Sequence, residues 1–194
     1  MCSSNYKGNE AILNSKAYTF FNIQGRERQA SSGSYYNQIE AQAIANIVQQ
    51  IQRKTRLDRS STPWYSSRKI RIITFYQAQV SCLRQCLNER GAEKVLVATV
   101  DSSQGCEADI VILSFVRSNQ RAGFLRDDRR MNVALTRAKY QLICVGDVTG
   151  TLSVTGVNTL DALIADAKKR DVIRDFDHRE ESSTGPLRTR RYRR

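Results

Sequence analysis

The sequence predicts an α/β fold in which a mostly parallel sheet is flanked by helices, and three observations lead to this prediction. Apolar segments typical of strands alternate along the chain with segments whose apolar residues recur at helical spacing. The strand segments are continuous apolar runs, as expected for parallel strands that are buried on both faces. The chain has 194 residues, which is enough for one domain with a core of its own.

β-branched and aromatic residues predict the strands. The first, AYTFFNI, is rich in aromatic residues, and the second, IRIITF, is almost entirely apolar. The predicted strands are residues 17–23, 70–75, 94–99, 109–115 and 141–147.

Helical spacing of apolar residues predicts the helices. The first begins after Asn37, because Asn37 with Glu40 three residues later matches a capping box. Its apolar face is predicted to contain Ala41, Ile44, Ile47, Val48 and Ile51. Gly91 closes the second helix, and acidic residues open the third. These later helices are predicted over residues 77–91, 127–140 and 158–171.

The remaining segments lack an apolar period. A loop is predicted over residues 25–37 and a surface excursion over residues 53–69. We expect an irregular lead-in over residues 1–16 and a disordered basic tail over residues 178–194. The sequence therefore predicts one folded domain over residues 17–177.

The charge balance favours an anionic partner. The formal net charge is +12 at pH 7, from 31 Lys and Arg against 19 Asp and Glu. Nucleic acid is the usual partner of so basic a domain, and the alternative is a basic surface with no partner. No apolar run is long enough to span a bilayer, and no signal core follows Met1. We therefore expect no membrane association and a cytoplasmic or nuclear protein.

Several kinds of active site lack their residues in this sequence. The cysteines form no C-x-x-C pair and the only histidine is His178, so we expect no metal site. The same lone histidine excludes a Ser/His/Asp triad. A G-x-x-x-x-G-K-[ST] phosphate loop is absent, and no Asp-Glu pair follows an apolar strand.

A polar joint separates two of the predicted buried strands. It runs from Thr99 to Asp109 and carries Asp101, Gln104 and Glu107. Ligands of parallel sheets bind at the carboxyl ends of the strands. The joint after Thr99 is at such an end.

Three segments in series carry a family resemblance. They are IITFYQAQ (72–79), ATVDSSQGCEADIVILSFVRSN (98–119) and GFLRDDRRMNVALTRAKYQLICVGD (123–147). In this order and spacing they resemble the second RecA-like domain of superfamily 1 helicases, in the up-frameshift/senataxin-like branch. GSYYNQIEAQAI (33–44) is similar to the segment that opens this domain in that branch. The resemblance covers residues 18–172 and implies a RecA-like, P-loop NTPase-type domain.

The resemblance implies two kinds of ligand contact near the ends of strands. Tyr76 would lie beside the base or the phosphates of a nucleotide. Thr99 and Val100 would touch the backbone of the nucleic acid, which a hydroxyl and backbone N–H groups can do without reading sequence. The alternative for Tyr76 is packing at the end of its strand.

Further implied contacts concern the nucleotide. Gln104, Gly105 and Glu107 match a turn in which the glycine allows close backbone approach and the glutamate reaches the sugar. Arg137 matches an arginine that reaches across a cleft to the γ-phosphate. We expect Arg137 and this turn to line one wall of that cleft. The alternatives are a strand start for Glu107 and a solvated helix position for Arg137.

One position departs from the family pattern. At Gln38, relatives in this branch carry an arginine that senses phosphate, and a glutamine carries no charge. In this family ATP lies between two RecA-like domains, and the first domain holds the phosphate loop and the Mg²⁺ carboxylates. We therefore expect this chain to bind ATP and Mg²⁺ only when a first RecA-like domain completes the site, and only weakly alone.

The expected partners are such a first domain and single-stranded RNA or DNA. One interpretation is a helicase C-terminal motor domain, inactive alone, with Arg137 as the catalytic arginine. The alternative is a stand-alone nucleic-acid-binding module that kept the fold and lost ATP hydrolysis.

Overall fold

A computed structural model describes residues 17–55, 63, 65–66, 68–118, 123–150, 158–176 and 189–191. The strands of its main sheet are β1 (Tyr18–Asn22), β4 (Ile70–Thr74), β5 (Leu96–Thr99), β6 (Ala108–Ser114), β7 (Ala138–Gly146), β8 (Ile173–Phe176) and β9 (Thr189–Arg191). Their spatial order is β5-β4-β6-β7-β1-β8-β9. Neighbouring strands are parallel except for β8 and β9. The predicted α/β fold with a mostly parallel sheet is confirmed.

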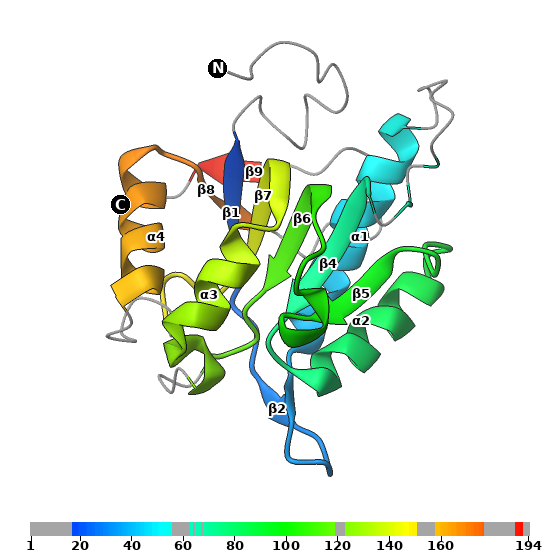
Figure 1. Ribbon diagram of the computed structural model, residues 1–194, viewed down its shortest axis with the longest axis horizontal. Coiled ribbons are helices and arrows are strands. Elements are labelled where there is room, and N and C mark those ends of the chain that lie inside the picture. Colours follow the sequence, from blue (N-terminus) through cyan, green and yellow to red (C-terminus); the bar gives the residue numbers. More distant parts are fainter. Residues whose placement is uncertain are drawn as a thin grey trace.

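Helices cover both faces of this sheet (Figure 1). One face carries α1 (Gln38–Thr55) and α2 (Gln77–Asn88), and the other carries α3 (Asp128–Leu135) and α4 (Asn158–Lys169). Successive residues of a strand point to opposite faces. In β6, for example, Ile110 and Ile112 belong to the core under α1 and α2, whereas Val111 and Leu113 belong to the core under α3 and α4. This two-sided burial explains why the strands are continuous apolar runs.

The start of α1 is stabilised as the sequence predicted, but its capping box is incomplete. Asn37 Oδ1 accepts a hydrogen bond from the Glu40 N–H at 3.2 Å. In a full capping box the Glu40 carboxylate would bind the Asn37 N–H, which instead donates to Gln79 Oε1 at 2.8 Å. The Glu40 carboxylate is thereby available for other partners.

The third predicted helix is too long. It was expected over residues 127–140, but α3 ends at Leu135 and Ala138 already belongs to β7. Thr136 Oγ1 donates to the Asn132 carbonyl at 2.8 Å, and Arg137 Nε donates to the Val133 carbonyl at 2.9 Å. The Asn132 carbonyl also accepts from the Thr136 N–H, but the Val133 carbonyl, which the Arg137 N–H would bind in a longer helix, accepts from Arg137 Nε, while the Arg137 N–H donates to the Ala134 carbonyl.

Two other elements correct the sequence-based prediction. The predicted loop 25–37 contains a hairpin of β2 (Arg28–Gln29) and β3 (Tyr35–Tyr36), which pair antiparallel. Strand β8 was not predicted, and it pairs with β1. Its sequence, IRDF, is short and half polar, so it lacks a strong strand pattern.

The terminal and excursion predictions lie largely outside the described residues. Residues 1–16 and most of the predicted excursion 53–69 lie outside the described residues. Of the predicted disordered tail 178–194, the structure describes only β9, and at those three residues it has a strand paired with β8. Within the described residues, no helix is long and apolar enough to cross a bilayer.

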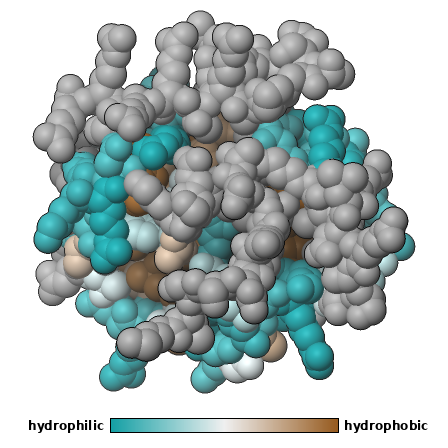
Figure 2. Space-filling model, turned by 90° about the horizontal axis from the view of Figure 1, so that it is seen from above, coloured by the Kyte–Doolittle hydropathy of each residue, from teal (hydrophilic) through white to brown (hydrophobic). Residues whose placement is uncertain are grey.

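The common direction of the parallel strands gives the sheet two distinct edges. We call the edge where they begin the amino edge and the edge where they end the carboxyl edge. In Figure 1 the amino edge is at the top, and the hairpin of β2 and β3 extends below the carboxyl edge. Figure 2 looks onto the molecule from above, and hydrophilic residues make up most of its coloured surface.

Candidate functional site

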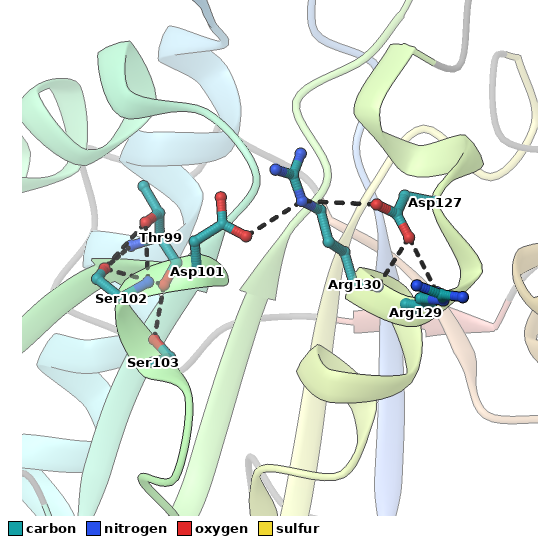
Figure 3. Close-up of polar contacts among 7 residues, drawn as sticks. All are labelled: Thr99, Asp101, Ser102, Ser103, Asp127, Arg129 and Arg130. Carbon is teal, nitrogen blue, oxygen red and sulfur yellow. Dashed lines mark hydrogen bonds and ion pairs between the residues drawn. The ribbon is translucent and has the colours of Figure 1, made fainter.

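A cluster of hydroxyl groups follows β5 at the carboxyl edge. Thr99 Oγ1 lies 2.9 Å from Ser102 Oγ, and the Thr99 N–H donates to Ser102 Oγ at 3.0 Å. Ser103 Oγ donates to the Thr99 carbonyl at 2.8 Å. These contacts hold the short helix η1 (Asp101–Ser103) against the strand end, as Figure 3 shows. Thr99 thus lies at the edge where the sequence predicted ligand contacts.

Val100 is placed differently from Thr99. Its side chain is only 3% exposed. Its N–H donates to the Thr74 carbonyl at 2.9 Å, and its carbonyl accepts from the Ser103 N–H at 3.1 Å. Val100 therefore positions η1, and the predicted contact with nucleic acid at this residue remains a prediction.

An ion pair joins η1 to the start of α3. Arg130 Nε lies 3.1 Å from Asp101 Oδ1 and 3.6 Å from Asp127 Oδ2 (Figure 3). Asp127 Oδ1 also accepts hydrogen bonds from the Arg129 and Arg130 N–H groups, at 3.0 and 3.2 Å. The arrangement is an N-cap with local ion pairing, to which the structure adds the bridge across to Asp101.

Two of the residues expected to contact a nucleotide, Glu107 and Arg137, lie at the other edge. The Ala108 N–H donates to the Arg137 carbonyl at 3.0 Å, and Ala108 pairs with Ala138 at the start of β6 and β7. Glu107 and Arg137, which precede these strands, are therefore side by side. That they line one wall of a cleft stays a prediction. The joint begins at the carboxyl end of β5, whereas Glu107 and Arg137 lie at the amino edge.

Residues 100–107 cross from one edge of the sheet to the other, which explains this division. β5 and β6 both run parallel to β4, so the chain must return to the amino edge before β6 begins. Gln104 and Gly105 are exposed within this return. Gly105 has a φ of +75°, a conformation that glycine adopts without steric cost.

The side chains of Arg137 and Glu107 have partners that fix their positions. The Nε of the half-buried Arg137 is held by the Val133 carbonyl at the end of α3. Within the described residues, no carboxylate lies within ion-pair distance of Arg137. Glu107 is about half exposed, and its Oε2 lies 3.9 Å from Lys139 Nζ. The described amino edge thus presents the Arg137 guanidinium and a solvent-accessible Glu107 carboxylate.

Tyr76 is buried at the carboxyl edge, with 2% of its surface exposed. Its ring packs edge-on against Tyr35 at 6.0 Å and lies 5.5 Å from the ring of Phe124. Burial raises the pKa of its hydroxyl to about 12. In this conformation Tyr76 packs at the end of its strand and offers no ring face to a nucleotide base.

Gln38 contacts two thiols of α2. Cys82 Sγ donates to Gln38 Oε1 at 3.0 Å, and Gln38 Nε2 donates to Cys86 Sγ at 3.5 Å. Both ends of the amide are therefore used by α2. Its predicted contact with a nucleotide stays a prediction.

The structure also contains a buried polar network that sequence reasoning missed. Glu40 is 0% exposed, and its carboxylate accepts from the Val116 N–H at 3.0 and 3.1 Å and from Ser114 Oγ at 2.7 Å. Burial raises the pKa of Glu40 to about 8, although the hydrogen bonds from Ser114 and Val116 oppose this effect. Val116 has a φ of +73°, which is rare for a β-branched residue, so the carboxylate holds a strained turn after β6.

A buried ion pair lies next to this turn. Arg117 Nε is 3.2 Å from Glu27 Oε2, and both side chains are only 4% exposed. The guanidinium also lies over the Tyr35 ring, 4.1 Å from its centroid. In the sequence, the only indication for Arg117 was its place after the predicted strand 109–115, within a segment that carries the family resemblance. Among the described residues, no three His, Cys, Asp or Glu side chains gather as a metal site would require.

Comparison with known proteins identifies similar sequences. A family model described as "AAA domain" matches residues 2–149. An uncharacterized ATP-dependent helicase of Methanocaldococcus jannaschii is 39% identical over 137 residues, which are 70% of this chain and 19% of that protein. The regulator of nonsense transcripts 1 homologue of Drosophila melanogaster is 40% identical over 137 residues, 66% of this chain and 11% of that protein. Helicase sen1 of Schizosaccharomyces pombe is 34% identical over 137 residues, 68% of this chain and 8% of that protein. The chain thus spans less than a fifth of these relatives.

Proposed function

The chain belongs to the AAA domain family and is a superfamily 1 helicase domain of the up-frameshift/senataxin-like branch. On this basis we propose that it is the C-terminal motor domain of an ATP-dependent RNA or DNA helicase. The observation that carries this proposal is that Glu107 and Arg137 precede neighbouring strands at the amino edge, where the Ala108 N–H donates to the Arg137 carbonyl at 3.0 Å. In the proposed motor this edge faces a first RecA-like domain, and ATP binds between the two.

Arg137 is the proposed catalytic arginine. A guanidinium binds phosphate oxygens in a forked geometry and neutralises charge that develops during phosphoryl transfer. Its Nε bond to the Val133 carbonyl supports this role, because it fixes the guanidinium relative to α3 before any ligand binds. Arginines of this kind increase the rate by roughly 10³- to 10⁵-fold.

Glu107 and the turn before it are proposed to bind the sugar of the nucleotide. A carboxylate accepts hydrogen bonds from hydroxyl groups, and the exposure of Glu107 leaves its oxygens accessible. Gly105, exposed and at positive φ, allows the backbone to approach a ligand closely. These residues would form one side of a nucleotide site, and a phosphate loop, which this sequence lacks, would belong to the other side.

We infer that the isolated chain binds ATP at millimolar concentration at best. One charge-assisted contact contributes roughly 1.5–3 kcal/mol, whereas immobilising a ligand costs about 4–15 kcal/mol. The burial of Tyr76 removes the stacking contribution that would otherwise offset part of this cost. Mg²⁺ would enter with the first domain, whose carboxylates would hold it.

Nucleic acid is proposed to bind at the carboxyl edge, where the hydroxyl of Thr99 at the end of β5 lies 2.9 Å from that of the exposed Ser102 in η1. Residues 100–107 connect this edge to the nucleotide-binding turn. A displacement of the turn on ATP binding or hydrolysis would therefore reach the nucleic-acid contacts directly along the backbone. This continuity supports a motor domain, in which the two ligands must be coupled.

The test is complementation. The full chain is mixed with a first RecA-like domain from a relative, and ATP hydrolysis is measured with and without single-stranded RNA. We expect activity only in the mixture, and Arg137→Ala should lower kcat at least 10³-fold. Lys168→Ala, an exposed change in the last turn of α4, is the matched control and should leave kcat unchanged. Equal activity of Arg137→Ala and wild type would exclude the catalytic role.

An alternative is a stand-alone nucleic-acid-binding module without ATP hydrolysis. It is favoured by the contacts of Gln38, whose amide is bound by Cys82 and Cys86 and carries no charge toward a phosphate. Under this alternative the chain binds single-stranded RNA, but no first domain restores hydrolysis.

A further inference from the structure

Phe124 is a large apolar side chain that is exposed at the carboxyl edge. It belongs to the short helix η2 (Gly123–Arg126), which precedes α3, and 54% of its surface is accessible. Arg130 Cζ lies over the Phe124 ring, 5.2 Å from its centroid. Because Arg130 also pairs with Asp101 of η1, the ring is connected to the segment that carries Thr99 by two successive contacts.

The position of the Phe124 ring is fixed from beneath. The buried Tyr76 ring lies 5.5 Å from it. Gly123 has a φ of +53°, and a Cβ at this residue would lie 2.8 Å from the Tyr76 hydroxyl. Only a glycine allows η2 to approach Tyr76 so closely, so the buried tyrosine supports an exposed and pre-positioned aromatic ring.

The charges around Phe124 largely compensate one another. Arg130 is paired with Asp101 and Asp127, and Asp127 also caps the Arg129 N–H. An exposed aromatic ring among such paired charges is suited to stack on a flat ring of a ligand. The ring itself would contribute stacking, which does not depend on salt, rather than charge neutralisation.

We propose that Phe124 is a stacking residue for one base of single-stranded nucleic acid, held in place by Tyr76 and Arg130. The inference rests on the proposed function for the presence of nucleic acid at this edge. It assigns Tyr76 a supporting role in that path instead of a nucleotide contact. Aromatic rings stack on any base, so the contact carries no sequence preference.

The experiment measures binding of the full chain to a fluorescein-labelled 12-nucleotide oligo(A) RNA by anisotropy, from low to moderate salt. Phe124→Ala should weaken the Kd roughly 5- to 150-fold, the loss typical of one stacked base. The slope of log Kd against log salt should stay at the wild-type value, because no phosphate contact is lost. Phe124→Tyr should retain the affinity, and Phe124→Leu should lose most of it, since it keeps an apolar side chain but no ring.

Two controls separate stacking from other effects. Tyr140→Ala removes an aromatic side chain of equal exposure, 53%, from the amino half of β7 and should leave RNA binding unchanged. Inorganic polyphosphate, an anion without bases, should bind wild type and Phe124→Ala equally. Two results would overturn this inference but not the proposed function. One is that Phe124→Ala binds the RNA as tightly as wild type, and the other is that Phe124→Ala loses as much affinity for polyphosphate as for the RNA. Failure of the wild-type chain to bind the RNA at all would overturn it together with the proposed nucleic-acid site.

Discussion

Replacing Glu40 by glutamine should remove a large pH dependence of folding stability. The Glu40 carboxyl is 0% exposed, and burial raises its pKa from 4.5 to about 8. Below pH 4.5 the group is protonated in the folded and the unfolded chain, and its contribution is fully present. Between pH 4.5 and 8 the unfolded chain loses this proton while the folded chain retains it, so stability falls as the pH rises.

The magnitude follows from the width of this interval. The pKa values of 4.5 and about 8 differ by about 3.5 pH units, and each unit corresponds to about 1.4 kcal/mol. The free energy of unfolding should therefore lose about 5 kcal/mol across the interval through this one group. That is a large part of the roughly 5–15 kcal/mol that stabilises a typical domain.

The assay is urea unfolding of wild type and Glu40→Gln at pH 5, 6, 7 and 8, extrapolated to zero urea. Glutamine resembles the protonated acid and can still accept the Val116 N–H, so the variant should keep the fold. The stability of the wild type relative to the variant should fall by about 1.4 kcal/mol per pH unit. The only histidine, His178, is present in both proteins, so its titration cancels.

Glu93→Gln, the same change at an exposed position, is the control for the substitution itself. A constant difference between wild type and Glu40→Gln would refute the reasoning, because it would mean that Glu40 ionises alike in the folded and the unfolded chain.

Further predictions concern the carboxyl edge. Gly123→Ala should destabilise the chain by more than the roughly 1–2 kcal/mol of a left-handed conformation, because its Cβ also meets the Tyr76 hydroxyl. Gly33→Ala, at a φ of +80° where an added Cβ would meet no atom within 4 Å, should show the backbone effect alone; urea unfolding of both compares them. Glu27→Gln should cost about 3–5 kcal/mol, because it leaves the Arg117 charge buried without its carboxylate. The double change Glu27→Gln with Arg117→Met should recover part of that loss in the same assay, and a double variant as unstable as the sum of the single ones would contradict a coupled pair.

The regular elements could be predicted where a local pattern specifies them. The apolar face of α1 and the five predicted strands are present, because each depends on the spacing of residues along a short segment. The end of α3 was misplaced, since the apolar spacing continues through Ala138 although Thr136 and Arg137 cap the helix earlier. β8 was missed because it lacks a local pattern and is stabilised by pairing with β1.

The buried network had no sequence signal of comparable strength. Glu40 and Val116 are 76 positions apart, and Glu27 and Ser118 are 91 apart, so neither pairing shows in a local window. The capping-box pattern identified Glu40 but assigned its carboxylate to the wrong partner. Long-range hydrogen bonds of this kind depend on how the elements pack, which periodicity does not describe.

The sequence by itself determined the α/β class, the order of most elements and the residues that carry the family resemblance, because these depend on local spacing. Only the tertiary structure decided the edge of the sheet at which each residue lies. Thr99 and Phe124 lie at the carboxyl edge, whereas Glu107 and Arg137 lie at the amino edge. The physical reason is that β5 and β6 run in the same direction, so residues 100–107 must return from the carboxyl edge to the amino edge. Thr99 and Glu107, although close in sequence, therefore lie at opposite edges of the sheet.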